Sequence, residues 1–260
     1  MFANADSYER FMGRWSAKLA PLLTDFGRIP RAGYVLDVGS GSGALSFSLA
    51  ARFPHLRVKG VDRSPEFVDS TASRNSVAGR LSFEGGDAQM LPFADATFDA
   101  ASSLLVLNFI PDSGTAISEV RRVTKPGGWI SAAVWDYGAG MRMLRVFWDA
   151  AVSLDEAAEK GDEKHMPLCR EGELFALWKG QGLKRIEASP LDFEMDFASF
   201  ADFWEPFLEG QGPAGAYVQS LDPEARAALG EEVLRRLGLS SRERAFRLEA
   251  RAWAVRGVVP

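Results

Sequence analysis

The feature that most constrains the fold is an alternation of short apolar strands with helices between residues 33 and 136. Runs typical of buried strands occur five times, at 33–39, 57–62, 80–87, 98–107 and 129–136. Segments with helical patterning of about a dozen residues lie between them, at 43–54, 64–75 and 112–125. Parallel strands need such crossovers. The pattern therefore predicts an α/β fold in which helices cover both faces of a parallel sheet.

The regular alternation of strands and helices ends after residue 137. Helical patterning fills 137–180 and 199–240, while 183–197 and 245–257 are patterned as strands. We expect the two strands to form an antiparallel appendage on the sheet, and the two helical insertions to cover its carboxyl edge as a lid. A helical lead-in is predicted over 5–27, where apolar residues recur at helical spacing.

Composition indicates a soluble protein that folds as one domain, 1–260. The chain has 47% hydrophobic and 25% charged residues and a formal net charge of -5, which weighs against a nucleic-acid or anionic-membrane partner. Cys169 is the one cysteine, so no intrachain disulfide can form and a reducing compartment is favoured. The sequence has no apolar run long enough to span a membrane. We predict a cytoplasmic protein, either a monomer or a homodimer.

Chemistry-bearing residues stand where three successive strands end. Gly39, Gly41 and Gly43 follow the first strand, within VLDVGSGSGALS (35–46); Asp62 ends the second strand and Asp87 the third. In an open α/β sheet, ligands bind beyond the carboxyl ends of the strands. Each residue also has a purely structural explanation, as a turn glycine, a helix-start acid or a turn acid. The combination favours a nucleotide-like ligand.

The sequence resembles the class I S-adenosylmethionine-dependent methyltransferases of the small-molecule type, related to the ubiquinone/menaquinone C-methyltransferases. The motifs that carry the resemblance are VLDVGSGSG (35–43), VDRSPEFV (61–68), GGDAQMLPFADATFDAASSLLVLNFIPD (85–112) and EVRRVTKPGGWI (119–130). It covers the core, 33–136, in detail. It implies a Rossmann-like, three-layer fold with a seven-stranded, mostly parallel sheet whose last strand is antiparallel, and S-adenosylmethionine as cofactor.

The resemblance also implies roles for individual residues. The loop Gly39–Gly43, with Ser40 and Asp37, would hold the methionine end of the cofactor, and Asp62 would bind its ribose hydroxyls. The adenine would be contacted by Arg63, Asp87 and Ala88, and the methyl group by Ser103 and Leu104. Three residues of the lead-in would cover the cofactor, although helix packing explains them equally well: Tyr8, Arg14 and Trp15.

The same glycines also fit a dinucleotide pattern, Gly39-x-Gly41-x-x-Ala44. A pyrophosphate needs close approach to the backbone at the helix start, and an acid beside it would repel it. Asp37 instead suits a ligand with an ammonium group and no phosphate. This favours methyl transfer. An NAD(P)-dependent oxidoreductase and a non-catalytic S-adenosylmethionine-binding module are the alternatives.

The sequence says less about the methyl acceptor. Ser103-Leu104-Leu105-Val106 stands where amino-methylating enzymes commonly carry an Asn/Asp-Pro-Pro-aromatic turn. We therefore expect a small, partly apolar acceptor that is methylated on oxygen or carbon. Asp136 and His165 are weak candidates for a general base, and a surface position is the favoured interpretation of His165. Aromatic residues that could line an acceptor pocket, but at helical spacing more often form core, are Phe147, Trp148, Phe203, Trp204 and Phe207. We predict no metal site, and Cys169 as neither catalytic nor metal-binding.

Overall fold

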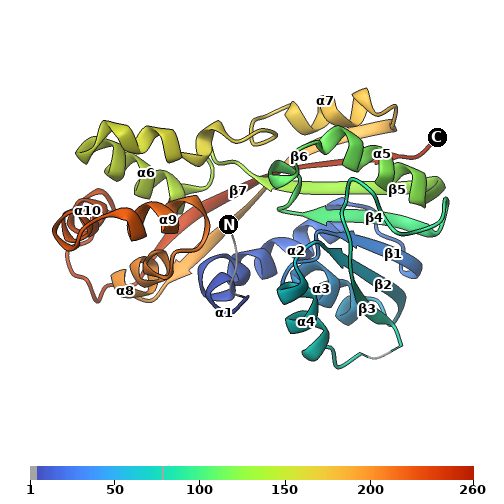
Figure 1. Ribbon diagram of the computed structural model, residues 1–260, viewed down its shortest axis with the longest axis horizontal. Helices are drawn as coiled ribbons and strands as arrows, with labels where there is room; N and C mark the ends of the chain where they lie inside the picture. Colours follow the sequence, from blue (N-terminus) through green and yellow to red (C-terminus); the bar gives the residue numbers. More distant parts are fainter. Residues whose placement is uncertain (1–4, 78) are drawn as a thin grey trace. The chain divides into compact units, whose positions relative to one another are not determined.

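The computed structural model describes residues 5–77 and 79–260. Its strands form one seven-stranded sheet in the order β3-β2-β1-β4-β5-β7-β6 (Figure 1). The strand bounds are β1 Ala32–Val38, β2 His55–Asp62, β3 Leu81–Gly85, β4 Phe98–Leu104, β5 Thr124–Trp135, β6 Lys184–Phe197 and β7 Phe246–Val258. Each predicted strand is present, with ends that differ from the sequence prediction by a few residues.

The predicted strand directions are confirmed. β1 pairs in parallel with β2 and β4, β2 with β3, and β4 with β5. β7 pairs antiparallel with β5, from Trp129 opposite Val258 to Trp135 opposite Ala252. The structure therefore has the mostly parallel sheet with an antiparallel last strand that the sequence predicts.

The chain divides into two compact units, and the larger one comprises residues 13–135, 167–191 and 252–260. Its helices are α2 Arg14–Phe26, α3 Ala44–Arg52, α4 Pro65–Ser73, α5 Ser113–Val123 and α7 Glu173–Gly180, with a short turn η2 at Leu107–Phe109. Figure 1 shows α2 and α3 on one face of the sheet and α5 and α7 on the other. Val35, Leu36 and Val38 of β1 are fully buried between these layers, as expected for a central parallel strand.

Among the described residues, the smaller unit comprises 5–12, 136–166 and 192–251. Its longer helices are α6 Arg142–Leu154, α9 Gly212–Ser220 and α10 Pro223–Arg236, and its short elements are η3 Glu156–Gly161, η4 Glu163–His165, α8 Phe200–Trp204 and η5 Glu205–Glu209. Phe147 of α6 stacks on Phe207 of η5, with ring centroids 4.6 Å apart. Phe147, Trp148, Phe203 and Phe207 are at most 1% exposed. These aromatic side chains form the core of the unit.

The lead-in predicted as helical over 5–27 is helical from Ala5 to Phe26, but it is not a single regular α-helix. α1 Ala5–Tyr8 is followed by a π-helical segment, η1 Glu9–Gly13, before α2 begins. The π-helical turn ends at a glycine, where no side chain stiffens the backbone. Tyr8 belongs to the smaller unit, whereas Arg14 and Trp15 belong to the larger one.

Pro126-Gly127-Gly128, which precede the strand predicted at 129–136, lie inside β5. Phe98 pairs with Thr124, but Ala100 already pairs with Trp129, so the intervening residues of β5 bulge out of the ladder. Gly127 has a φ of 81°, which glycine adopts without a steric cost. A bulge of this kind keeps the strand continuous while it breaks the regular pairing.

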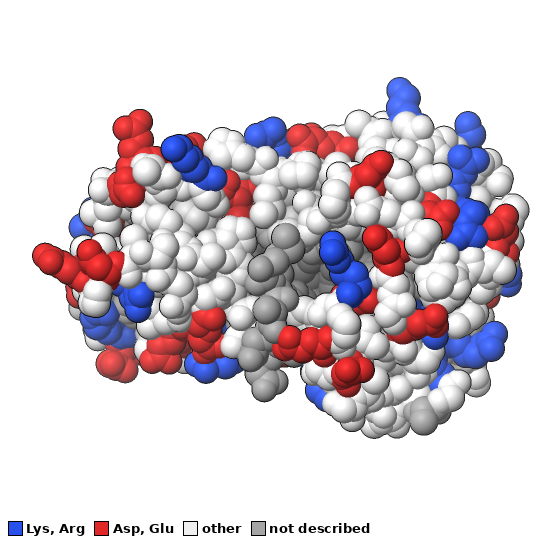
Figure 2. Space-filling model, in the orientation of Figure 1, with Lys and Arg blue, Asp and Glu red and all other residues white. Residues whose placement is uncertain are grey.

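Acidic and basic side chains are interspersed over the face shown in Figure 2. Among the residues that the structure describes, no helix is long and apolar enough to cross a membrane. Within the same residues, no group of three or more His, Cys, Asp or Glu side chains is arranged to hold a metal ion.

Candidate functional site

The glycine loop after β1 has a backbone that side chains would disrupt. Gly39, Gly41 and Gly43 have φ values of 71°, 48° and 85°. A Cβ at Gly39 would lie 2.5 Å from Val106 Cγ1, and one at Gly43 would lie 2.6 Å from the Phe47 ring. At Gly41 the nearest described atom would be 4.0 Å away. The loop is therefore packed at its two ends and open in its middle.

Asp62 fixes this open middle to the end of β2. Its Oδ2 accepts a hydrogen bond from the Gly41 amide at 2.8 Å, and its Oδ1 accepts one from the Ser64 amide at 2.9 Å. A carboxylate oxygen has two lone pairs, so each oxygen can accept a further hydrogen bond. Asp62 thus assists the start of α4 and remains able to bind a ligand; the two interpretations of the sequence do not exclude each other.

Two residues of the α4 region that the sequence analysis missed also fix the loop. Thr71 Oγ1 donates to the Gly41 carbonyl at 2.8 Å, and Arg74 Nη2 donates to the Ser42 carbonyl at 2.6 Å. Their spacing of three residues, one helical turn, is the only sequence signal that could have indicated a common target.

Asp37 is the most unusual group of the site. It is 1% exposed, and its Oδ2 accepts a hydrogen bond from Ser46 Oγ at 2.7 Å. Its Oδ1 is buried without a hydrogen-bond partner in the described part of the chain. Burial raises the pKa of Asp37 from 3.8 to about 7, because desolvation disfavours the carboxylate. The site therefore contains a buried acceptor that a cationic donor would satisfy.

Two serine hydroxyls share this property. Ser40 Oγ, in the glycine loop, and Ser103 Oγ, on β4, are buried and have no partner among the described residues. By contrast, the neighbouring Ser102 Oγ lies 2.9 Å from Ser131 Oγ. Buried polar groups are normally satisfied, so these unpaired atoms fit a polar ligand at the carboxyl edge.

The third strand end reaches the same edge. The Gly86 amide donates to the Asp62 carbonyl at 2.9 Å, which places the residues after β3 beside β2. Asp87 is exposed, and its Oδ1 accepts a hydrogen bond from the Gln89 amide at 2.9 Å. Arg63 is also exposed, Ala88 is half-buried, and Leu104 at the end of β4 is buried. The structure therefore brings three of the predicted strand ends to one edge.

The remaining predicted residues lie elsewhere in the chain. In the larger unit, the Arg14 guanidinium lies 4.2 Å from the Trp15 ring centroid. Three others belong to the smaller unit. Tyr8 is half-buried. Asp136 is buried, and its Oδ1 accepts a hydrogen bond from the Ala139 amide at 3.1 Å. His165 has an exposed side chain whose Nε2 lies 3.0 Å from Glu159 Oε1.

A buried charged cluster in the smaller unit was not predicted. Arg145 donates to both carboxylate oxygens of Asp162, at 3.1 and 2.6 Å, and all of these side chains are at least nine-tenths buried. Next to them, Trp148 Nε1 donates to Glu163 Oε2 at 2.6 Å. Burial raises the pKa of Glu163 from 4.5 to about 7, and the charge of Asp162 adds to the effect. The cluster joins α6 to the segment 155–166.

This cluster makes stability depend on pH. The folded state holds the Glu163 proton more tightly than the unfolded state, so its stabilising contribution is complete below pH 4.5 and is lost as pH rises to about 7. Glu163→Gln keeps the acceptor for Trp148 without the charge. We expect the variant to be about 1–3 kcal/mol more stable than the parent at pH 8 and nearly equal at pH 4.5, measured by urea unfolding. A difference in the free energy of unfolding between the two proteins that is the same at pH 4.5 and pH 8 would contradict this assignment.

In comparisons with known proteins, the matching family model and the two relatives described below are all named as methyltransferases. Residues 36–132 match the family model described as "Methyltransferase domain". The chain is 28% identical over 158 residues to a malonyl-[acyl-carrier protein] O-methyltransferase of Xylella fastidiosa, covering 61% of this chain and 52% of that protein. It is 35% identical over 99 residues to the ubiquinone/menaquinone biosynthesis C-methyltransferase UbiE of Desulfotalea psychrophila, covering 38% of this chain and 40% of the relative.

A solved structure extends the likeness of fold over almost the whole chain. Phosphoethanolamine N-methyltransferase 2 of Haemonchus contortus, in complex with S-adenosyl-L-methionine, superposes with a TM-score of 0.62 at 20% identity, over 98% of this chain and 56% of that one. The chain spans about half the length of the curated relatives it matches.

Proposed function

We propose that the chain is a class I, S-adenosylmethionine-dependent methyltransferase, because residues 36–132 match the model of a methyltransferase domain. Its cofactor site is the carboxyl edge of β1, β2, β3 and β4. The small-molecule acceptor is partly apolar and receives the methyl group on oxygen or carbon.

The observation that carries this proposal is the unpaired, buried Oδ1 of Asp37. A dinucleotide pyrophosphate would meet a carboxylate at this point, without a counter-ion, and the repulsion would be strong in a low-dielectric site. The ammonium of a methionine moiety would instead donate to Oδ1 and pair with its charge. This is why an NAD(P)-dependent oxidoreductase is the weaker alternative.

The other residues of the edge complete the site in this proposal. Asp62, already held by two amides, accepts hydrogen bonds from the ribose hydroxyls. Asp87 and Ala88 meet the adenine edge, with Arg63 beside it. Ser40 and Ser103 supply hydroxyls to the methionine end, and Leu104 lines the place of the methyl group. Residues proposed to cover the cofactor are Tyr8, Arg14 and Trp15.

The bound cofactor supplies a sulfonium methyl group that is reactive toward an in-line nucleophile. The chain's own residues orient the acceptor and exclude water. The O/C assignment is supported by Ser103-Leu104-Leu105-Val106 after β4 and by the names of the two relatives, an O- and a C-methyltransferase. Asp136 and His165 are the candidates for a base if the acceptor must lose a proton; buried Asp136 is the stronger, because His165 is exposed.

Methyl transfer is tested directly with methyl-labelled S-adenosylmethionine and a panel of phenols, carboxylic acids, quinones and enolisable ketones. We expect label in at least one extracted product, and formation of S-adenosylhomocysteine at the same rate. Cofactor binding without turnover across the panel would favour the non-catalytic binding module.

The pKa of Asp37 predicts how cofactor affinity depends on pH. In the free protein the carboxyl is largely protonated below about pH 7, whereas pairing with an ammonium requires the carboxylate. Affinity for S-adenosylhomocysteine should therefore fall as pH drops below 7, by up to about tenfold per unit. Asp37→Asn should bind weakly at every pH and lose this dependence. Calorimetric titrations at pH 5.5, 6.5 and 7.5 measure it; a pH-independent affinity for the parent protein would exclude an ammonium contact at Asp37.

A further inference from the structure

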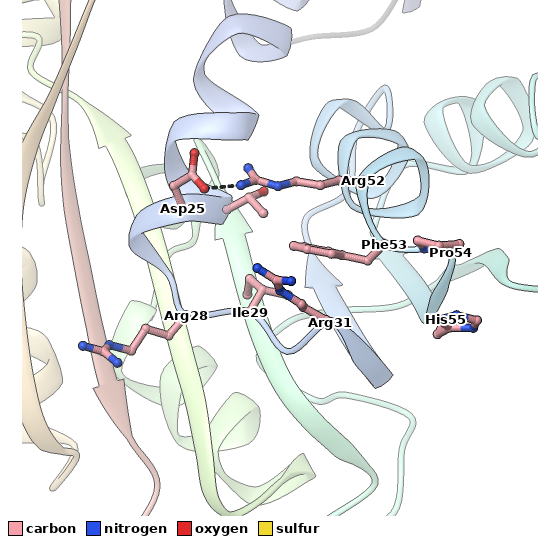
Figure 3. A pocket seen from close by; sticks show the side chains of 9 residues that line it. Asp25, Arg28, Ile29, Arg31, Arg52, Phe53, Pro54 and His55 are labelled. Atoms are coloured by element: carbon pink, nitrogen blue, oxygen red, sulfur yellow. Dashed lines mark hydrogen bonds and ion pairs between the residues drawn. The ribbon is translucent and has the colours of Figure 1, made fainter.

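A second pocket lies at the opposite, amino-terminal edge of the same sheet. It is an open depression of about 520 Å³ formed where β1 and β2 begin (Figure 3). The residues that line it are Thr24, Asp25, Arg28, Ile29, Arg31, Arg52, Phe53, Pro54 and His55. The seven residues of β1 separate it from the glycine loop, about 20 Å away. Nothing in the proposed methyl transfer uses this pocket.

The lining carries an excess of positive charge. Three arginines face one acid, Asp25, which pairs with Arg52. Arg31 is exposed and has no ion pair or hydrogen bond within the described residues. Arg28 points away from the pocket (Figure 3) and Asp25 pairs with Arg52, so the local surplus is about one positive charge, in a chain whose formal net charge is -5.

Helix ends do not account for this surplus. Basic residues often lie at the carboxyl ends of helices, where they offset the helix dipole, and α2 and α3 both end near the pocket. Arg80, however, already donates to the carbonyls of Ala50 and Phe53 at the end of α3, at 3.2 and 3.3 Å. Arg256 donates to the Phe26 carbonyl at the end of α2. Neither lines the pocket, so Arg31 and Arg52 are additional to the cations that the helix ends require.

The rest of the lining is apolar. Ile29, Phe53 and Pro54 contribute carbon surface, and the Arg52 guanidinium lies 5.5 Å from the Phe53 ring centroid. Figure 3 shows Arg31 and Arg52 near Phe53, while Arg28 points away from them; its guanidinium lies 5.4 Å from the Trp129 ring centroid. Arg31 and Arg52 are therefore the cations available to a ligand in the pocket.

We propose that this pocket binds a phosphate monoester with a small apolar group. Guanidinium groups recognise phosphate through paired N–H donors. Arg31 supplies one guanidinium that has no ion pair, and Arg52 supplies a second whose remaining N–H donors face the dianion beside its pair with Asp25. The volume lies in the range of small-molecule sites and far exceeds one water-sized group. Ile29, Phe53 and Pro54 contact the organic part, which distinguishes an ester from inorganic phosphate.

The test is a calorimetric titration with phenyl phosphate and, separately, with inorganic phosphate. Phenyl phosphate should bind saturably, about tenfold more tightly than inorganic phosphate. In Arg31→Gln/Arg52→Gln its affinity should fall by about tenfold or more. Arg142→Gln removes an exposed arginine from α6 and serves as the control for loss of a positive charge away from the pocket; it should bind like the parent.

Equal binding of both probes would overturn the ester assignment. No saturable binding of either, or an equal loss in the Arg142→Gln control, would overturn the site itself. The double variant must melt like the parent, which is expected because both side chains are exposed. It should also keep the parent's affinity for S-adenosylhomocysteine, so failure of this proposal and failure of the proposed cofactor site are distinguishable.

Discussion

Asp62→Ala is expected to weaken the binding of S-adenosylhomocysteine by about 100-fold or more. The carboxylate has two functions at once in our account: it accepts the Gly41 and Ser64 amides, at 2.8 and 2.9 Å, and it accepts the ribose hydroxyls. Each hydrogen bond to a charged group contributes about 1.5–3 kcal/mol, and loss of the Gly41 contact also loosens the open middle of the loop.

The control is Asp69→Ala, which removes an exposed carboxylate from α4, the helix that follows Asp62. It should bind with the affinity of the parent protein. Thermal melting of both variants separates loss of the ligand contact from loss of the fold. If Asp62→Ala bound S-adenosylhomocysteine within threefold of the parent, the ribose would have to be recognised elsewhere.

Gly39→Ala and Gly41→Ala are expected to fail in different ways. At position 39 a Cβ would lie 2.5–2.7 Å from three atoms of Val106, in a backbone with φ of 71°. Overpacking and left-handed strain together cost about 2–4 kcal/mol, so this variant should melt several degrees lower and bind poorly.

At position 41 the added methyl meets no described atom closer than 4.0 Å, so its cost to the fold is about 1–2 kcal/mol from the left-handed backbone alone. Its expected defect is in binding, because the methyl occupies space that the methionine end would fill. Circular-dichroism melting of the two variants measures the loss of stability, and calorimetry measures the loss of affinity for S-adenosylhomocysteine. If Gly41→Ala bound S-adenosylhomocysteine with the affinity of the parent protein, the ligand could not contact the middle of this loop.

Much of the site was predictable because it lies at strand ends. The alternation over 33–136 fixes which residues end parallel strands, and parallel strands align those ends at one edge. Gly39, Asp62 and the residues around Asp87 could therefore be placed together before the structure was known. The antiparallel pairing of β7 could be predicted similarly, since a strand after a long helical insertion was expected to extend the sheet.

The missed features depend on contacts between distant residues. Nothing in the local sequence shows that Asp37 Oδ1 is left without a partner, or that Thr71 and Arg74 hold the glycine loop. The Arg145, Asp162 and Glu163 cluster is likewise invisible, because charged residues are normally read as exposed. The helical spacing over 5–27 likewise does not show the π-helical turn at Glu9–Gly13.

The central claim is that the carboxyl edge of the sheet binds the methionine and adenosine parts of one ligand. Calorimetric titration of the purified, cofactor-stripped chain with S-adenosylhomocysteine, at pH 7.5, tests it most directly. We predict saturable binding at one site per chain, with no competition from NADH or NADPH. Absence of binding by S-adenosylhomocysteine and S-adenosylmethionine, or saturable binding of NAD(P)H in their place, would contradict the account.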